Sequence, residues 1–461
     1  LIAYVTTFSI VFIFYMHTFS GNYYNSIEVR CMLKRKFMND LLEWKNTQST
    51  SKTKQCLLVK GARQVGKSTL IEEFGRTYYD NFISVDFRKE KELRTIFDDS
   101  FDINSLIGKF SLLRPGIQFI PGKTLLLLDE IQDCPNARSS LKYWALDARF
   151  DVIASGSLLG VSLVAASVPV GYEKVKTLHA MDFEEFLWAL GIDSNAINTL
   201  KPYFTNGLHI PDAINNKMFE YLRTYMITGG MPNVINKYLT THDFFSVDQE
   251  QNTIIDGYRD DIACYTETDE RIKARSCYDS IPRQLLKDNH KFQYKEVKQG
   301  KASSYFMSSI DWIENAGMAT RCYNLYEPAF PIKGYIDEDK FRLYMNDIGL
   351  LTASYGYQTK SSVFNNQLYG NLKGALYESL IADFLIKKNY PLVYYKNQKG
   401  TVELEFFIEK DSSIIPIEVK ANNSRTASLN NLLKDEHIPY GYKFITGNSD
   451  IDKKKITLPL Y

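Results

Sequence analysis

The chain has 461 residues, of which 44% are hydrophobic and 24% are charged. This length exceeds that of a typical single domain, so it predicts about two to four domains with packed cores. Lysine and arginine together number 55, against 54 acidic residues. The near-neutral balance excludes a global positive field that would draw the chain to nucleic acid or to an anionic membrane, so any such contact requires a local basic patch.

The cysteines are scattered, with no CxxC pair and no nearby histidines at the spacing of metal ligands. Neither a zinc site nor a set of paired cysteines is indicated, and a reducing cytosol is the simplest setting. We therefore expect a cytoplasmic protein. The six cysteines are Cys31, Cys56, Cys134, Cys264, Cys277 and Cys322.

The first segment departs from this composition. Residues 1–19, LIAYVTTFSIVFIFYMHTF, are apolar enough for a membrane span or a signal sequence. No basic residue precedes the apolar run, however, and no clear small-residue cleavage site follows it. An amphipathic pattern typical of a soluble helix begins after Met32. We expect residues 1–31 to be translated upstream sequence, with a membrane anchor through residues 1–19 or a cleaved signal as the alternatives.

A phosphate-binding loop is predicted at GARQVGKS, which matches the pattern GxxxxGK[ST]. The short buried strand CLLVK precedes it, and TLIEEFGRTYY after it has helical spacing. The glycines allow backbone N–H groups to turn toward phosphates, and the N-terminus of the helix adds to the positive field. We expect Lys67 to reach the β- and γ-phosphates of ATP and Ser68 to bind Mg²⁺. The expected nucleotide contacts are Gly61, Ala62, Arg63, Gln64, Val65, Gly66, Lys67, Ser68, Thr69, Asp129 and Ser157.

A second acidic strand strengthens this interpretation. KTLLLLDEIQDCP has four consecutive leucines followed by Asp129 and Glu130, as expected of a central parallel strand whose carboxyl end faces a ligand. Asp129 is predicted to bind Mg²⁺, and Glu130 to orient and deprotonate the attacking water, so Lys67 and Glu130 are the predicted catalytic residues. FDVIASGS ends in Ser155 and Ser157, which either contact the γ-phosphate or the water or are ordinary turn residues. FISVDF adds another strand.

Blocks of sequence from about Met32 to the end of the chain resemble prokaryotic AAA-type ATPases that carry a C-terminal domain of unknown function. One departure from the family pattern is Tyr172, which follows Gly171 where a basic residue is expected, with Lys174 two positions further on. The blocks are LLEWKN, KGARQVGKSTLIEEFG, LLLLDEIQDCP, LKYW, ASGSLLGVSL, SVPVG, MDFEEFL, GGMPNVINKYL, FRLYMNDIGLL and GALYESLIADFL, in that order.

The order of patterns predicts an α/β P-loop NTPase with a parallel sheet, followed by a helical part in which Gly229, Gly230 and Pro232 mark a turn between two helices. The resemblance to AAA-type ATPases implies that these helices form a lid over the nucleotide. The next part resembles a winged helix-turn-helix and the last an α/β restriction-endonuclease-like domain. The predicted divisions are residues 32–190 for the ATPase core, 191–279 for the lid, 280–355 for the winged-helix-like segment and 366–461 for the nuclease-like domain.

In the winged-helix-like segment, apolar residues recur at helical spacing and are expected in the core. They are Phe306, Ile310 and Ile313. The basic residues of the same segment either contact DNA phosphates or form a solvated helical face. They are Lys295, Lys298 and Lys301.

The C-terminal part contains acids in a pattern that resembles the PD-(D/E)xK nuclease core. Glu378 lies on an amphipathic helix, and the strand TVELEFFIE is expected to place Glu403 and Glu405 on one face. IIPIEVK places Glu418 and Lys420 on one face, and a hairpin between the two strands would bring Glu405 near Glu418. The resemblance implies that Glu378, Glu405 and Glu418 hold Mg²⁺ and that Lys420 positions water. In that family the residue at the position of Glu405 is usually aspartate, and the longer glutamate could misplace a metal ion. Two interpretations therefore stay open: metal-dependent cleavage, or a nuclease-like fold kept for packing or DNA contact.

Two functions from different classes follow from these patterns. The first is an enzyme that hydrolyses ATP with Mg²⁺ and uses the cycle to act on DNA. The second is a nucleotide-operated switch that binds a protein partner through an inactive nuclease-like domain. A homo-oligomer is compatible with either function, and a membrane partner is not expected.

Overall fold

The computed structural model describes residues 33–461 except for 51–53, 158–169, 266–267 and 422–425. The chain divides into two units, residues 1–32 and 33–461. The expectations for residues 1–31, including the anchor at residues 1–19, therefore lie outside the described residues, as does most of the segment containing SLLGVSL and SVPVG. None of the helices described is long and apolar enough to cross a membrane.

The first sheet is entirely parallel, with strand order β2-β3-β4-β1-β5. The run of leucines from Leu125 to Leu128 forms β3 and is fully buried, which explains why it has no polar alternation. This confirms the α/β class with a parallel sheet. The strands are β1 (Cys56–Gly61), β2 (Asn81–Asp86), β3 (Thr124–Asp129), β4 (Asp151–Ser157) and β5 (Glu173–Thr177).

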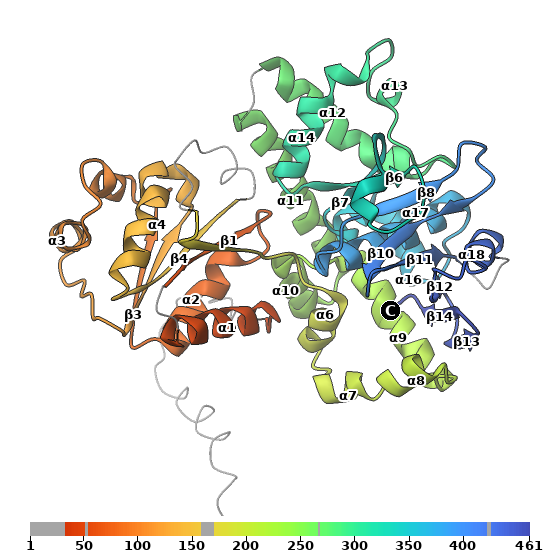
Figure 1. The fold of residues 1–461 in the computed structure, drawn as a ribbon, viewed down its shortest axis with the longest axis horizontal. Helices are drawn as coiled ribbons and strands as arrows, with labels where there is room; N and C mark the ends of the chain where they lie inside the picture. The colour runs from red at the N-terminus through yellow and green to blue at the C-terminus, as the bar shows by residue number, and fades with distance from the viewer. Residues whose placement is uncertain (1–32, 51–53, 158–169, 266–267, 422–425) are drawn as a thin grey trace, which may run out of the picture. The chain divides into compact units, whose positions relative to one another are not determined.

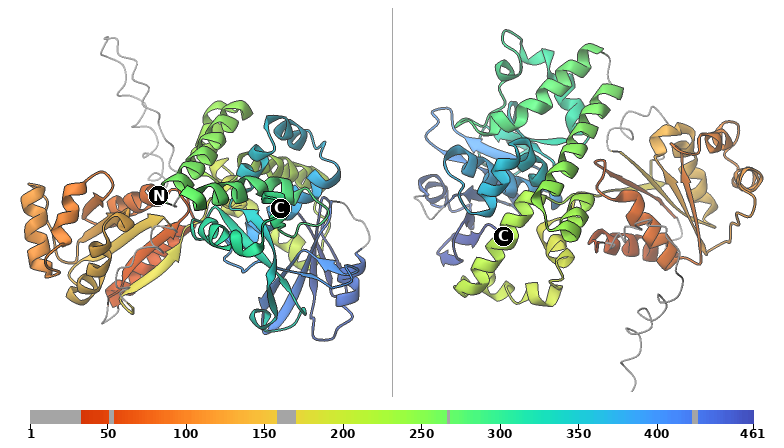
Figure 2. Two further views of the ribbon diagram at one scale, coloured as in Figure 1. Left: turned by 90° about the horizontal axis from the view of Figure 1, so that it is seen from above. Right: turned by 180° about the vertical axis from the view of Figure 1, so that it is seen from behind.

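Helices cover both faces of this sheet (Figure 1, Figure 2). Leu57 and Val59 of β1 pack in one hydrophobic cluster with residues of α1 and α2, whereas Leu58 packs in another with residues of α3 and α4. Alternate side chains of one strand thus anchor opposite layers. The helices are α1 (Phe37–Thr50), α2 (Lys67–Tyr78), η1 (Lys91–Phe97), α3 (Ile103–Leu113), η2 (Ile131–Asp133) and α4 (Pro135–Asp147).

The next part of the chain is helical, as its sequence predicts. Gly229 and Gly230 separate α9 from α10, and Pro232 is the first residue of α10, where a missing N–H has no cost. The helices are α6 (Phe183–Ala189), α7 (Ser194–Asn198), α8 (Lys201–Asn206), α9 (Asp212–Thr228), α10 (Pro232–Thr241), α11 (Phe244–Tyr265) and α12 (Thr268–Leu285).

Short helices and an antiparallel strand pair follow α12. Phe306, Ile310 and Ile313 are buried, which confirms them as core residues. β6 and β7 pair antiparallel with a register shift between Tyr323 and Asn324. The elements are α13 (Tyr294–Val297), η3 (Ser303–Tyr305), α14 (Met307–Asn315), β6 (Ala319–Leu325), η4 (Ile332–Tyr335), β7 (Ile336–Met345), α15 (Ile348–Ser354) and α16 (Tyr357–Phe364).

The C-terminal part contributes strands to two sheets. One has the order β10-β11-β12-β14-β13, and the other has the order β7-β6-β8-β9. The second sheet therefore spans the predicted boundary between residues 280–355 and 366–461. The elements are α17 (Gly370–Lys387), β8 (Val393–Lys396), β9 (Glu403–Leu404), β10 (Phe406–Lys410), β11 (Ser413–Val419), α18 (Ala427–Leu432), β12 (Gly441–Ile445), β13 (Asp450–Asp452) and β14 (Lys455–Pro459).

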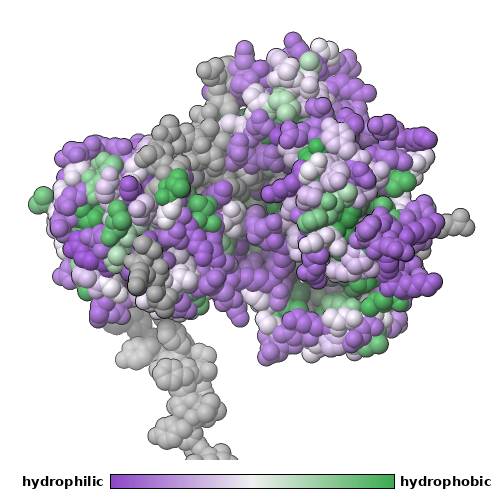
Figure 3. Space-filling view, in the orientation of Figure 1, coloured by the Kyte–Doolittle hydropathy of each residue, from purple (hydrophilic) through white to green (hydrophobic). Residues whose placement is uncertain are grey.

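The segment TVELEFFIE, expected as one strand, is two strands separated by Glu405. β9 pairs with β8, whereas β10 pairs with β11, so the chain changes sheets at this residue. The expected hairpin between β10 and β11 is present. On the face seen in Figure 3, hydrophilic residues predominate and the hydrophobic residues form small separate patches.

Candidate functional site

The phosphate-binding loop joins the end of β1 to the start of α2. Gln64 has φ 65° and Gly66 has φ 90°, so the backbone turns through two left-handed residues before the helix begins. Such turns allow successive N–H groups to face one concave space. A Cβ atom at Gly61 would overlap the carbonyl oxygen of Leu178. The loop thus requires glycine at both fixed positions, at Gly61 for space and at Gly66 for conformation.

Lys67 is the first residue of α2, and its amine lies back over the loop. Nζ donates hydrogen bonds to the carbonyl oxygens of Gly61, at 3.0 Å, and Ala62, at 2.8 Å. Burial lowers the pKa of Lys67 to about 8, while the nearby charges of Glu130 and Asp129 favour its protonated form. The amine therefore lies on the carbonyl oxygens of the loop, near enough to the acids at the end of β3 for their charges to affect its pKa.

Asp129 ends β3 and is almost fully buried. Its Oδ1 accepts a hydrogen bond from the Ser155 hydroxyl and another from the Glu130 backbone N–H at 3.0 Å. β4 lies between β1 and β3, which brings Ser155 to Asp129 and pairs Ser157 with Gly61. Ser155 therefore orients the predicted metal ligand, a role beyond the two alternatives that the sequence left open for it.

Glu130 follows directly, in a left-handed backbone conformation with φ 52°. This conformation is rare for a residue other than glycine and costs about 1 kcal/mol or more, so surrounding contacts must hold it. The carboxylate accepts a hydrogen bond from the Gln132 side-chain amide, and its Oε2 lies 3.9 Å from an Arg88 nitrogen. The backbone turn separates Glu130 from Asp129 and leaves its side chain partly accessible to water.

The expected Mg²⁺ ligands fit that ion in their chemistry. Ser68 supplies a hydroxyl oxygen and Asp129 a carboxylate oxygen, and Mg²⁺ prefers oxygen ligands, including those of substrate phosphates. Within the described ranges, no group of three or more His, Cys, Asp or Glu side chains could hold a metal ion. A site of this kind does not need such a group, because phosphate and water complete the coordination.

Arg35 also holds the loop, and sequence reasoning missed it. Its guanidinium donates to the carbonyl oxygens of Val65, at 2.9 Å, and His179, at 2.7 Å, and pairs with Glu185 at 3.2 Å. Arg35 thereby ties the loop to the segment after β5. The sequence contains no direct signal for Arg35. It does indicate its partner Glu185, because DFEE is the pattern of a helix start in which Asp182 and Glu185 form a capping box.

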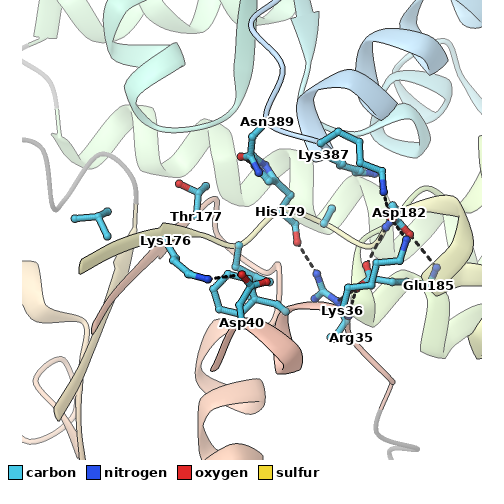
Figure 4. A pocket seen from close by; sticks show the side chains of 15 residues that line it. Arg35, Lys36, Asp40, Lys176, Thr177, His179, Asp182, Glu185, Lys387 and Asn389 are labelled. Atoms are coloured by element: carbon cyan, nitrogen blue, oxygen red, sulfur yellow. Dashed lines mark hydrogen bonds and ion pairs between the residues drawn. The ribbon is translucent and has the colours of Figure 1, made fainter. Parts of the chain in front are cut away.

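A cleft of about 430 Å³ lies beside Arg35 (Figure 4). Its cations are paired: Lys36 lies 2.6 Å from Asp182, and Lys176 pairs with Asp40. Lys388, which also lines the cleft, is exposed and lies 3.8 Å from the same Asp182, so ion pairs neutralise much of the charge of the cleft.

Three of the C-terminal residues come together as the hairpin predicts. Lys420 Nζ donates to Glu405 at 3.1 Å and lies 3.4 Å from Glu418, and the Val419 backbone N–H also donates to Glu405. Burial raises the pKa of Glu405 to about 7, and the charges of Glu378 and Glu418 add to the rise, whereas Lys420 opposes it.

Glu378 is held by polar side chains of the protein itself. One carboxylate oxygen accepts hydrogen bonds from Arg342, at 2.6 Å, and from the Tyr344 hydroxyl, and the other lies 3.0 Å from His290 Nδ1. Arg342 is fully buried and also pairs with Glu403. In this arrangement Arg342 already pairs with Glu378, and among the described residues no group of three or more His, Cys, Asp or Glu side chains is placed to hold a metal ion. The nuclease assignment of these residues stays a prediction.

The lysines considered for DNA contact lie on or just after α13. Lys295, Lys298 and Lys301 are all exposed. Lys301 Nζ lies 4.9 Å from the centre of the Tyr305 ring. The positions are accessible to a phosphate backbone, as an electrostatic contact requires.

Comparison with protein families gives three matches. Residues 53–187 match the model of a family described as an AAA domain. Residues 219–361 and 373–461 match two models described as domains of unknown function, DUF8612 and DUF4143. No curated protein matches the chain.

Solved structures give weaker likenesses. The Walker-type ATPase PABY2304 of Pyrococcus abyssi is 13% identical, with a TM-score of 0.42 over 70% of this chain and 96% of that chain. The Aeropyrum pernix ORC1 protein in complex with DNA is 10% identical, with a TM-score of 0.30 over 74% and 97%. The Thermotoga maritima RuvB Holliday junction branch migration motor is 12% identical, with a TM-score of 0.29 over 63% and 90%. TM-scores this low do not support a conclusion about the function of this chain.

The five-stranded parallel sheet, the phosphate-binding loop and the AAA-domain match together define the class of the first domain. It is similar to AAA-type P-loop domains. The expectation from sequence is confirmed at this level. The winged-helix-like and nuclease-like parts match only families without a described function.

Proposed function

We propose that this chain binds ATP with Mg²⁺ at the loop from Gly61 to Thr69 and hydrolyses the bond between the β- and γ-phosphates. One observation carries the proposal: the Lys67 amine lies on the carbonyl oxygens of the loop and is near enough to Asp129 and Glu130 for their charges to affect its pKa. In this proposal, Lys67 is the phosphate-binding cation and acts together with the two acids that follow β3.

Each group has a separate role in this proposal. Lys67 and the backbone N–H groups of the loop bind the phosphates, and Glu130 takes the proton of the attacking water. Mg²⁺, held by Ser68 and Asp129, would neutralise phosphate charge. Ser155 keeps Asp129 in place, and Arg35 keeps the loop against the rest of the domain. Ser157, paired with Gly61, is within the same group of strand ends.

We further propose that the ATP cycle is coupled to an activity on DNA through residues 280–355. The exposed cations Lys295, Lys298 and Lys301 support this coupling. Since the chain is nearly neutral overall, this local patch must provide the attraction.

A second candidate is a nucleotide-operated switch that acts on a protein partner. The observation that favours it is the pairing of Glu378 with Arg342 and His290, which suits an inactive nuclease-like domain better than a metal-dependent one. A nucleotide-dependent change could pass from the lid to the C-terminal half through one hydrogen bond, which the Gly230 N–H donates to Asp347 at 2.7 Å.

One assay separates the two candidates. ATP turnover is measured with and without duplex and single-stranded DNA, at low salt and again at higher salt. DNA-stimulated turnover that falls steeply with salt supports the first function, since phosphate contacts release counterions. Turnover that DNA leaves unchanged at low salt supports the switch. Lys67→Ala protein is the control, and turnover equal to that of the wild type in this variant would exclude the loop as the site.

A further inference from the structure

Arg63 is the cation within the loop GARQVG, and its side chain is not directed at the loop itself. It forms an ion pair and hydrogen bond with Asp261 on α11. The Asp261 carboxylate is mostly buried, and burial raises its pKa while the charge of Arg63 opposes that rise. A buried acid depends strongly on such a partner, because removing one member leaves an uncompensated charge.

The same turn of α11 also binds the backbone of Arg63. The Tyr258 hydroxyl donates to the Arg63 carbonyl oxygen at 3.3 Å, and the Asn346 side-chain amide donates to the Tyr258 hydroxyl at 3.1 Å. A small space beside this contact is lined by Arg63, Ser157, Tyr258, Asp261, Trp312, Ala316 and Met318. One residue of the phosphate-binding loop is thus in contact with the helical lid and, through Tyr258, with the residue after β7.

Arg63 is also close to Lys67, to which the proposed function assigns the β- and γ-phosphates. Lys67 donates to the carbonyl oxygen of Ala62, the residue directly before Arg63. The charge of Arg63 is near enough to Lys67 to lower the pKa of that lysine. A γ-phosphate bound by Lys67 would therefore meet a second cation, one that is now held by a carboxylate.

We propose that Arg63 distinguishes ATP from ADP by leaving Asp261 and binding the γ-phosphate, which removes the side-chain ion pair between α11 and the loop. The inference rests on the proposed function, since it requires ATP at this site. An arginine binds carboxylate and phosphate with the same planar donor group, so the two anions compete for it. Because ADP has no γ-phosphate, it leaves the contact with Asp261 intact.

This competition makes Asp261 a positioning residue with a defined thermodynamic effect. Breaking its contact with Arg63 opposes triphosphate binding and, by linkage, triphosphate binding weakens the hold of α11 on the loop. Removing the charge of Asp261 should therefore strengthen binding of the triphosphate more than binding of the diphosphate. A role in packing alone would change the two affinities together.

The test measures the dissociation constants of ADP and of a non-hydrolysable ATP analogue, with Mg²⁺, by calorimetry on the full chain. Asp261→Asn should raise the preference for the triphosphate by about fivefold or more, the lower end of typical allosteric couplings. Arg63→Ala should reduce that preference, and in the double variant the effect of Asp261→Asn should disappear. Arg63→Lys retains the charge without the planar fork and should lie between wild type and Arg63→Ala.

Asp279→Asn is the matched control. Asp279, on α12, pairs at 2.9 Å with Arg259 of α11, the helix that also carries Asp261. This pair does not include the loop, so the control should leave the preference unchanged. An unchanged preference in Asp261→Asn and Arg63→Lys, or the same increase with and without Arg63, would overturn the inference alone. If wild-type protein bound neither nucleotide, the proposed function would fail and the inference with it.

Discussion

At the scale of single residues, Lys67 gives the nucleotide site a pH dependence. Burial lowers its pKa from 10.5 to about 8, and bound phosphates favour the protonated amine. Below pH 8 the amine already carries its proton, whereas above pH 8 binding must take one up. We therefore expect ATP affinity to fall as the pH rises above 8, by up to about tenfold per pH unit.

Calorimetric titrations between pH 7 and pH 9.5, in buffers of different ionisation enthalpy, measure both the affinity and the proton uptake. Lys67→Arg is the control, because guanidinium does not titrate in this range. Constant affinity and no proton uptake in the wild type would contradict the expectation.

Glu130 separates binding from chemistry. Glu130→Gln keeps the size of the side chain and removes the base, so ATP binding should stay nearly unchanged while hydrolysis slows by about a hundredfold or more. Single-turnover measurement of phosphate release gives the rate. Asp133→Asn is a suitable control, since Asp133 pairs with Arg88 and Arg94 at the same end of the sheet. Equal hydrolysis rates in wild type and Glu130→Gln would show that another group is the base.

At the scale of elements, the break between α9 and α10 is a close backbone contact as well as a turn. The Gly230 N–H donates to Asp347, its carbonyl oxygen accepts from the Met181 N–H at 2.7 Å, and a Cβ there would overlap the Met181 carbonyl oxygen. Asp347 is fully buried, caps the N-terminus of α15 and lies 3.6 Å from Lys387. This contact connects the lid to both α15 and α17.

Gly230→Ala should therefore lower the free energy of unfolding by about 2–4 kcal/mol, because the added methyl group forces the backbone apart. Urea unfolding measures the change. Gly257→Ala is the matched control: it lies in α11, and a Cβ there meets nothing within 4 Å. The control should gain up to about 1 kcal/mol from helix propensity. If Gly230→Ala protein were as stable as the wild type, the backbone around Met181 would be able to move aside without loss of unfolding free energy.

The sequence predicts well those elements whose pattern lies within a short stretch of neighbouring residues. The leucine run of β3, the glycines of the loop and the glycine break between α9 and α10 each depend on neighbouring residues. The contacts that it misses join residues far apart in the chain. Asp347 lies 117 positions from Gly230, and Asp261 lies 198 positions from Arg63. No spacing rule connects such pairs, since they meet only after the elements pack.

At the scale of the whole molecule, the C-terminal part is not separate from the residues before it. β8 pairs with β6, and the partners of Glu378 are His290, Arg342 and Tyr344, all before the predicted boundary at residue 366. Sequence reasoning found Glu405, Glu418 and Lys420 through strand alternation. It could not find Arg342, which lies on β7 and reaches Glu378 only through the shared fold. A fragment of residues 366–461 would leave Glu378 without these partners, so metal binding has to be tested on the full chain.

We expect millimolar Mg²⁺ or Mn²⁺ to leave the melting temperature of nucleotide-free Lys67→Ala protein unchanged. A metal stabilises a protein only by binding its folded state, and here Arg342 and Lys420 already form ion pairs with the C-terminal acids. Arg342→Met should instead lower stability by about 3–5 kcal/mol with or without metal, because it leaves a buried carboxylate without its cation. Wild-type protein with ATP is the positive control, since Mg²⁺ bound with the nucleotide should raise its melting temperature. A metal-dependent rise in Lys67→Ala protein that Glu418→Gln abolishes, together with nicking of DNA, would instead establish a metal-dependent nuclease site at these carboxylates.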